Sequence, residues 1–300
     1  MKTKNFDVII IGGSYAGLSA ALALGRSLRK VLVIDAGKPC NRQTPHSHNF
    51  LTQDGSTPKQ IAEIAKNQIL NYKNVVFYNG IATGAKKINS DFEVNTDKQM
   101  VFTAKKLILA TGIKDLFPNI KGFKECWGIS VVHCPYCHGY EIRNQKTALI
   151  ANGDHAMHLL GLIQNLGNQV TITTHGKAKF TEEQQSKLEQ HQIEVIEKEI
   201  AEINHHNGFV ESIRFSDNSI VSYQSAYTVV PFEQNTQIPK LLGCEINEQG
   251  YIKVDAMQKT NITGVYACGD NSSMRSVATA VYTGNIAGVV ANKELVNDEF

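Results

Sequence analysis

The sequence predicts an α/β protein built from two doubly wound domains, because one pattern occurs twice along its 300 residues. A short apolar run, a glycine-containing turn, a helix-compatible segment and a second apolar run follow one another between residues 6 and 35. The same order returns between residues 147 and 173. Each copy is typical of a βαβ unit on a parallel sheet, and a chain of this length forms about two domains of ~150 residues.

The remaining segments complete these two domains. Pro118 and Pro231 lie where the chain is expected to cross between them, since proline favours an extended residue before it. The apolar stretch from residue 264 to 270 and a helix from about Ser276 to Leu295 are expected to return to the first domain. The predicted domains are therefore residues 1–116 with 235–300, and residues 117–234. The strands expected between the two units are Val75–Asn79, Gly80–Ile88, Phe92–Thr96, Met100–Ala104 and Leu107–Ala110.

Composition excludes several classes of protein. Hydrophobic residues make up 42% and charged residues 19% of the chain, which is typical of a folded globular protein. The 30 Lys and Arg against 28 Asp and Glu leave a net charge of +2, so no nucleic-acid partner is expected. No apolar run reaches the ~18 residues of a membrane helix. Six cysteines are too few for a disulfide scaffold and indicate a reducing, cytoplasmic location.

The first turn, Gly12 to Gly17, has the features of a dinucleotide site. Such a turn needs glycine at its tight bend and where the helix packs on the strand, and Gly12 and Gly17 meet these needs. Ser14 stands at the middle position, where its hydroxyl can face a phosphate. Asp35, about twenty residues on, stands where an acid accepts a hydrogen bond from a ribose hydroxyl. The alternative is a βαβ turn that binds no nucleotide.

Cys134, Cys137 and His138 form a C-x-x-C-H motif that carries the chemistry. Two thiols at this spacing can close a disulfide across one helical turn, and a helix N-terminus favours the attacking thiolate. The same letters also occur in covalent haem and zinc sites. Haem attachment requires export, and no signal peptide is evident; zinc requires two further ligands, and Cys126 and His133 do not form a standard pair. We therefore expect a redox-active dithiol and no metal.

Three segments resemble the FAD-binding signatures of two-dinucleotide-binding-domain flavoproteins: Phe6 to Gly17, Ala110 to Gly112, and Gly264 to Asp270. Together with the C-x-x-C of the second domain, they make the whole chain resemble the low-molecular-weight thioredoxin reductases. The resemblance implies FAD, a homodimer, a flavin-proximal Cys137 and an exchange thiol at Cys134. Asp270 would hold the ribitol, and the helix after it would point its positive end at the flavin. The cofactor-binding residues expected on these grounds are Gly12, Gly13, Ser14, Ala16, Gly17, Asp35, Ala36, Asn41, Arg42, Asn49, Thr111, Gly112, Gly269, Asp270, Arg275, Val277 and Ala278.

His138 stands where thioredoxin reductases have an aspartate that transfers protons. A histidine titrates near neutrality, so His138 is expected to accept a proton from either cysteine. The string Cys-Pro-Tyr-Cys-His-Gly-Tyr-Glu is similar to the branch of dithiol oxidases that close the disulfides of gliotoxin and holomycin. The residues of a preceding loop also resemble that branch, with a polar surface loop as the alternative: Asn41, Arg42, His46, His48, Asn49, Asp54 and Gly55.

The second βαβ unit departs from a nicotinamide site. Its turn starts with Ala151 in place of glycine, and Asp154 would put a negative charge near a pyrophosphate. The segment from Thr174 to Lys177 lacks the paired arginines that thioredoxin reductases place there, and no acid ends the preceding strand. Lys177 and nearby Lys179 would replace the arginines only in part, since lysine lacks the bidentate fork. NADPH is therefore a doubtful cofactor.

Three functions remain open. The first is a nicotinamide-independent dithiol oxidase or reductase, with oxygen or a protein electron carrier as the second redox partner. The second is an NADPH-dependent thioredoxin reductase with an atypical nucleotide site, and the third is a non-catalytic flavin redox sensor. His138 beside an intact C-x-x-C favours an enzyme, and the altered second turn favours the first function. The expected partner is a small dithiol or disulfide, or a thioredoxin-like protein.

Overall fold

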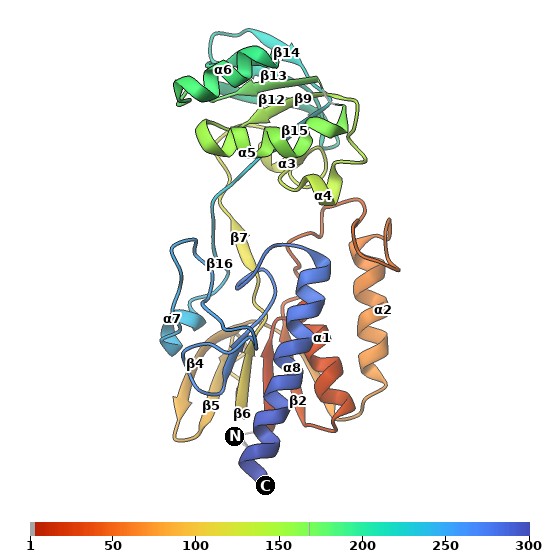
Figure 1. The fold of residues 1–300 in the computed structure, drawn as a ribbon. Helices are drawn as coiled ribbons and strands as arrows, with labels where there is room; N and C mark the ends of the chain where they lie inside the picture. The colour runs from red at the N-terminus through yellow and green to blue at the C-terminus, as the bar shows by residue number, and fades with distance from the viewer. Residues whose placement is uncertain (1–3, 168) are drawn as a thin grey trace. The chain divides into compact units, whose positions relative to one another are not determined.

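The structure is a computed structural model that describes residues 4–167 and 169–300 (Figure 1). The chain divides into two compact units. The first comprises the segments ending at Arg42, Phe50–Lys114 and Phe232–Phe300, and the second comprises Gln43–Asn49 and Asp115–Pro231. The sequence-based division kept residues 43–49 in the first domain. In the structure this segment lies with the second unit, where the His48 Nε2 atom is 3.5 Å from the Glu141 Oε1 atom.

The first unit is built on a mainly parallel sheet with the strand order β3-β2-β1-β6-β5-β4. The central strand β1 pairs in parallel with β2 and with β6, and β17 pairs in parallel with the end of β6. The apolar residues Val8 to Ile11 of β1 are all buried, as expected for a parallel strand covered on both faces. The elements of this unit are β1 (Lys4–Ile11), α1 (Tyr15–Arg26), β2 (Val31–Asp35), α2 (Pro58–Leu70), β3 (Val75–Asn79), β4 (Ala82–Ile88), β5 (Asp91–Thr96), β6 (Val101–Leu109), α7 (Ile238–Leu242), β17 (Val265–Ala267) and α8 (Val277–Glu299).

Strand β6 corrects one expectation. Residues 100–104 and 107–110 were expected to form two strands, because Lys105 and Lys106 interrupt the apolar pattern. They form the single strand β6, in which Lys106 is buried. The Lys106 ammonium lies 2.7 Å from a carboxylate oxygen of Asp298 and 3.5 Å from one of Glu294, both on α8. These ion pairs make a lysine tolerable inside the sheet.

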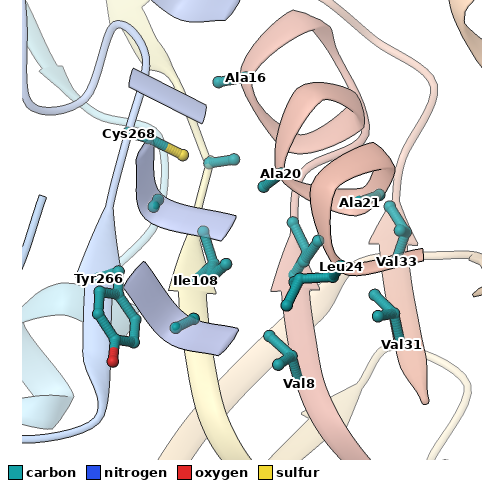
Figure 2. Packing of buried hydrophobic residues seen from close by; sticks show 14 of the residues in the cluster. Val8, Ala16, Ala20, Ala21, Leu24, Val31, Val33, Ile108, Tyr266 and Cys268 are labelled. Carbon is teal, nitrogen blue, oxygen red and sulfur yellow. The ribbon is translucent and has the colours of Figure 1, made fainter. Parts of the chain in front are cut away.

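Helices α1 and α8 pack closely against each other over the sheet, around the apolar cluster shown in Figure 2. A Cβ atom added to Gly284 of α8 would lie 2.1 Å from the backbone oxygen of Ala16 on α1. The helix backbones approach this closely only because small residues line the contact. The sequence analysis did not predict α2, although Thr57 and Gln60 form a capping box at its start.

The second unit contains a parallel sheet with the strand order β11-β10-β9-β15-β8 and an antiparallel sheet with the order β12-β13-β14. Helix α5 begins at Gly153, where the side chain of Asn152 caps it. The elements of this unit are α3 (Phe123–Cys126), β8 (Val131–Val132), α4 (Pro135–His138), β9 (Lys146–Ile150), α5 (Gly153–Ile163), a 3-10 helix (Gln164–Leu166), β10 (Gln169–Thr173), α6 (Glu182–Gln190), β11 (Glu194–Ile196), β12 (Ile200–His206), β13 (Phe209–Phe215), β14 (Ile220–Ser222) and β15 (Ser225–Thr228).

The two connecting segments, β7 (Ile113–Asp115) and β16 (Phe232–Gln234), pair with each other as a short two-stranded sheet. Two of the points where the chain passes between the units, after Lys114 and after Pro231, therefore lie on paired strands. Within residues 4–167 and 169–300, no helix combines the length and the apolar character that a membrane span requires.

Candidate flavin and dithiol sites

The turn between β1 and α1 has room only for glycine at two positions. Gly12 has φ +109°, and a Cβ atom on it would lie 2.0 Å from the backbone oxygen of Ala110. A Cβ atom on Gly17 would lie 1.8 Å from the backbone oxygen of Gly12. Any side chain at either position would force the turn away from the sheet. These glycines therefore hold the start of α1 against the carboxyl ends of β1 and β6.

Asp35 fixes the same turn from the end of β2. Its Oδ1 atom accepts a hydrogen bond from the Gly13 amide at 3.0 Å, and its Oδ2 atom accepts one from the Gly37 amide at 3.1 Å. A carboxylate has about four acceptor positions, so Asp35 keeps capacity for a ribose hydroxyl. In the described structure, Ser14 makes no side-chain capping bond and the first turn of α1 carries no acid. The first amides of α1 are therefore suited to a phosphate.

The second and third sequence signatures meet at Asn271, a residue that the sequence analysis did not select. Its buried side-chain nitrogen donates to the backbone oxygen of Leu109 at 2.9 Å and to the Thr111 hydroxyl at 3.1 Å. The Gly269 amide donates to the Thr283 hydroxyl of α8 at 3.0 Å. These bonds fix the backbone on both sides of Asp270. The signal available in the sequence was a polar residue directly after Asp270, the last residue of the third signature.

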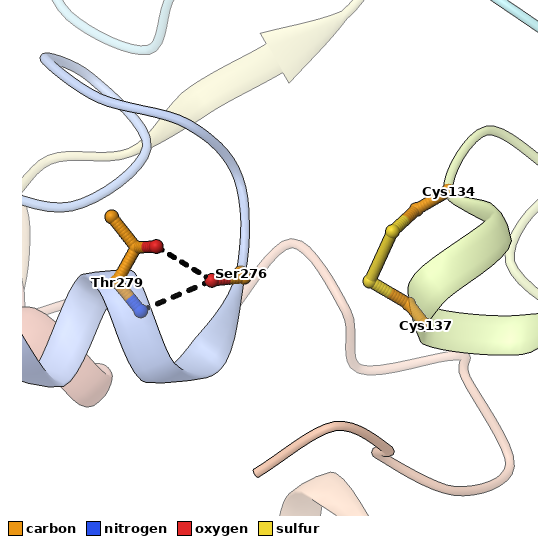
Figure 3. The surroundings of a disulfide bond; sticks show 4 residues. All are labelled: Cys134, Cys137, Ser276 and Thr279. Carbon is orange, nitrogen blue, oxygen red and sulfur yellow. Dashed lines mark hydrogen bonds between the residues drawn. A yellow bond between two sulfur atoms is a disulfide. The ribbon is translucent and has the colours of Figure 1, made fainter. Parts of the chain in front are cut away.

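The start of α8 follows this turn. The Ser276 hydroxyl accepts a hydrogen bond from the Thr279 amide at 3.0 Å and donates one to the Thr279 hydroxyl at 2.8 Å (Figure 3). The amides of Val277 and Ala278, the first two residues of the helix, lie at its positive end. Burial raises the pKa of the nearby Tyr251, and the positive charge of Arg275 opposes this rise.

The other expected cofactor residues are distributed as follows. The Asn41 side chain donates to the Tyr15 hydroxyl at 3.1 Å, beside the glycine turn, and Ala36 is exposed next to Asp35. The exposed Arg42 donates to the backbone oxygen of Pro39 at 3.0 Å. The structure therefore gathers the glycine turn, Asp35, Thr111, Gly269 and Asp270 within the first unit. Asn49 belongs to the second unit.

This set of residues fits FAD. The glycine turn leaves space for a pyrophosphate, Asp35 and Asp270 offer carboxylates at hydroxyl-binding positions, and the start of α8 offers amides. The Cys40 thiol donates to the Asp270 Oδ2 atom at 3.4 Å, so this carboxylate accepts hydrogen bonds on its exposed side. When bound, FAD supplies the capacity to take up and release two electrons.

The dithiol lies at helix α4 of the second unit. Cys134 and Cys137 form a disulfide, with their Cα atoms 5.3 Å apart (Figure 3). Cys134 is the N-cap residue, Pro135 starts the helix, and the Cys137 amide donates to the Cys134 backbone oxygen at 3.2 Å. Over the part of the chain that the structure covers, no three His, Cys, Asp or Glu side chains are grouped as metal ligands. The arrangement supports thiol-disulfide exchange.

His138 ends α4 and is largely withdrawn from solvent. Its two ring nitrogens are buried and have no hydrogen-bond partner among the described residues. Burial lowers the pKa of His138, the Glu141 carboxylate raises it, and the His48 ring lowers it. An imidazole held neutral in this way is able to accept a proton released at the neighbouring cysteines.

The remaining cysteines differ from this pair. Cys126, Cys244 and Cys268 are buried, and burial raises the pKa of Cys126 and of Cys268 to about 12. Thiols with such values do not act as nucleophiles near neutral pH. Cys40 is exposed beside Asp270 and does not belong to the dithiol.

The turn before α5 is occupied by hydrogen bonds within the chain. The Asn152 Oδ1 atom accepts from the amides of Gly153, at 2.9 Å, and Lys179, at 2.8 Å. Its Nδ2 atom donates to the backbone oxygen of Lys177 at 2.9 Å. The Ala178 amide donates to a carboxylate oxygen of Glu197 at 2.8 Å. The loop after β10 is thus joined to the turn by hydrogen bonds, and Glu197 places a carboxylate against the Ala178 amide of this loop.

Comparison of the sequence with known protein families assigns the chain to one of them. The family model of the pyridine nucleotide-disulphide oxidoreductases matches residues 6–284. The chain belongs to this family. This membership confirms the resemblance, the two-domain α/β fold class and the assignment as an FAD-dependent disulfide oxidoreductase.

Relatives of this disulphide oxidoreductase include proteins named as thioredoxin reductases. Thioredoxin reductase tcpT of Claviceps purpurea is 33% identical over 99% of this chain and 97% of its own length. Thioredoxin reductase sirT of Leptosphaeria maculans is 30% identical over 96% and 93%. The crystal structure of an oxidoreductase from Agrobacterium tumefaciens has a TM-score of 0.91 and 38% identity, covering 97% of this chain and 99% of its own. The crystal structure of HlmI has a TM-score of 0.91 and 27% identity, covering 98% and 94%.

Proposed function

We propose that this protein is an FAD-dependent oxidase of dithiols that works without a nicotinamide cofactor. Its dithiol chemistry would use Cys134, Cys137 and His138, and its substrate would be a small dithiol. The observation that carries the proposal is the turn at Asn152, whose side chain takes the hydrogen bonds that a bound pyrophosphate would need. The relatives named tcpT and sirT, both called thioredoxin reductases, support the wider disulfide chemistry.

The proposed exchange proceeds in two displacements at sulfur. A substrate thiolate attacks Cys134 Sγ, a new sulfur–sulfur bond forms, and Cys137 leaves as a thiolate. His138 then takes the proton of the second substrate thiol, which attacks the substrate sulfur of the mixed disulfide and releases Cys134. The substrate loses two electrons and two protons, and the cysteine pair gains the two electrons. Bound FAD would supply the two-electron acceptor that restoring the Cys134–Cys137 disulfide requires, with oxygen or a protein electron carrier as the final acceptor.

The alternative is a thioredoxin reductase that accepts NADPH. Productive NADPH binding requires contacts to the pyrophosphate and to the 2′-phosphate, and each charge-assisted hydrogen bond lost costs roughly 1.5–3 kcal/mol. The Asn152 bonds remove the first contact, and the pairing of Ala178 with Glu197 opposes the second. Two such losses weaken NADPH binding by roughly two to four orders of magnitude.

The deciding experiment is an anaerobic stopped-flow comparison of dithiothreitol, NADPH and NADH as reductants of the flavin. We expect dithiothreitol to bleach the flavin absorbance within a turnover and both nicotinamides to do so far more slowly. The Asn152→Gly variant frees the turn and should bind NADPH more tightly, while Asn204→Gly, a second polar residue of the same unit, serves as the control. Rapid bleaching of the unmodified protein by micromolar NADPH would restore the thioredoxin reductase function. Absence of bleaching by every dithiol would favour the redox sensor.

We further propose a homodimer held by α8. One face of this helix packs on α1, yet Tyr282, Val289 and Val296, spaced seven residues apart, are 60%, 51% and 44% exposed. Such a stripe on a helix is typical of a surface that a second copy covers. A cytoplasmic location agrees with the unoxidised thiols of Cys126, Cys244 and Cys268, since such thiols persist in reducing compartments.

A further inference from the structure

The turn that follows α4 brings an acid and a second histidine to His138. Glu141 lies three residues after His138, and the Ile142 amide donates to the His138 backbone oxygen at 3.3 Å, so the chain continues as a helical turn. Side chains three residues apart on such a turn are neighbours. Glu141 therefore stands beside an imidazole whose two nitrogens have no partner within the described structure.

His48 reaches the same place from a distant part of the sequence. Its Nε2 atom is 3.5 Å from the Glu141 Oε1 atom, and its side chain is 19% exposed against 40% for Glu141. The His48 and His46 rings lie 6.4 Å apart between centroids. The segment Gln43–Asn49 belongs to the same compact unit as α4, so this contact lies within one unit.

We infer that Glu141 and His48 are positioning residues for His138, acting in opposite directions. The Glu141 carboxylate favours protonation of the buried His138 imidazole, and the His48 ring disfavours it. The His48 ring also contacts the Glu141 carboxylate and so fixes its position. The pair would thereby set the pH range in which His138 exchanges a proton with the dithiol, an extension that rests on the proposed dithiol oxidation.

The groups that face His138 agree with this assignment. Burial lowers the pKa of His138, Glu141 raises it, His48 lowers it, and the nearby Cys134 backbone raises it. The buried Tyr227 of β15 lies beside the next residue: its hydroxyl is 3.1 Å from the position of a Cβ atom on Gly139. Burial raises the pKa of Tyr227, and the Glu141 carboxylate raises it further, so this phenol stays neutral. Glu141 and His48, whose Oε1 and Nε2 atoms lie 3.5 Å apart, are therefore the two side chains that act on His138.

The test measures His138 directly. NMR titration of the histidine ring protons, with His138 assigned by its loss in His138→Gln, is carried out on the oxidised protein. Glu141→Gln should move the His138 titration to lower pH, and His48→Gln should move it to higher pH. Glu141→Asp should restore most of the first shift. Glu183→Gln, which removes an exposed carboxylate 2.7 Å from Lys187 on α6 of the same unit, should leave His138 unchanged.

Kinetics provide the second readout. The neutral imidazole is the base, so the rate of disulfide exchange with dithiothreitol rises with pH through the His138 titration. The acid limb of this profile should move to lower pH in Glu141→Gln and to higher pH in His48→Gln. An unchanged His138 titration, or shifts of the same sign in both variants, would overturn the inference. Opposite NMR shifts in a protein that turns over no dithiol would support the pair and reject the proposed function instead.

Discussion

At the residue scale, Cys134 and Cys137 occupy different places on one helical turn. Cys134 is the N-cap of α4, so its sulfur precedes the first amides of the helix, while Cys137 lies within the helix. Amides at a helix start stabilise a thiolate at the N-cap position. On this difference and on the family resemblance, we propose that Cys134 is the exchange thiol.

We predict that the single-cysteine variants trap an external disulfide at different rates. In a Cys40→Ser background, Cys137→Ser should form a mixed disulfide with glutathione disulfide at Cys134 at least about tenfold faster than Cys134→Ser does at Cys137. Intact-mass spectrometry over time measures both rates. The Cys40→Ser change removes the exposed cysteine outside the C-x-x-C pair, so that only Cys134 and Cys137 are compared. Equal trapping rates would show that the roles of the two cysteines were assigned incorrectly.

Residue-level prediction from the sequence works where the chemistry is local. The C-x-x-C-H motif and the glycine turn are continuous segments, so their residue types and spacing already define what they do. Asn271, which joins two signatures, and the pair of His48 with Glu141 depend on contacts between distant positions. The sequence shows the polar residues but not which of them meet.

At the scale of elements, the packing of α1 on α8 depends on glycine. A Cβ atom on Gly284 would meet the Ala16 backbone at 2.1 Å, whereas one on Gly161 of α5 would meet nothing within 4 Å. Gly284→Ala should therefore destabilise the first unit by roughly 1–3 kcal/mol through overpacking, and Gly161→Ala should stabilise the second by about 0.4–1 kcal/mol. Hydrogen exchange of the amides in each unit measures both changes. Equal effects from the two substitutions would contradict the packing argument.

Apolar patterns in the sequence identified some helices and strands of this fold and missed others. Both βαβ units were predicted because their strands are continuous apolar runs. Strand β6 was divided in two because Lys105 and Lys106 appeared incompatible with a buried strand, and only the acids of α8 make Lys106 acceptable there. Helix α2 was missed although its Thr57–Gln60 capping box is readable in the sequence. Polar positions paired with distant residues are thus the main source of error.

At the scale of the whole molecule, the fold leaves the identity of the electron donor open. The chain shares its fold with the HlmI crystal structure at a TM-score of 0.91, and its relatives include named thioredoxin reductases. Fold alone does not choose between nicotinamide and dithiol as the reductant. In the function proposed here, that choice depends on a few hydrogen bonds around Asn152.

The exposed stripe on α8 leads to a prediction about assembly. Replacing Val289 by Glu places an unpaired charge at the centre of the stripe formed with Tyr282 and Val296. Burying this charge in a dimer interface would cost desolvation free energy and weaken the dimer. We expect Val289→Glu to weaken the dimer by at least about tenfold, a change of 1.4 kcal/mol. Sedimentation velocity over a range of concentrations measures the dissociation constant of the dimer.

Met257→Glu, at a position 53% exposed in a loop of the same unit, is the matched control and should leave the dissociation constant unchanged. Because α8 also packs on α1 beside the flavin residues, FAD content is recorded for both variants. A monomeric parent protein, or equal dissociation constants for parent and Val289→Glu, would show that the stripe does not hold a second copy.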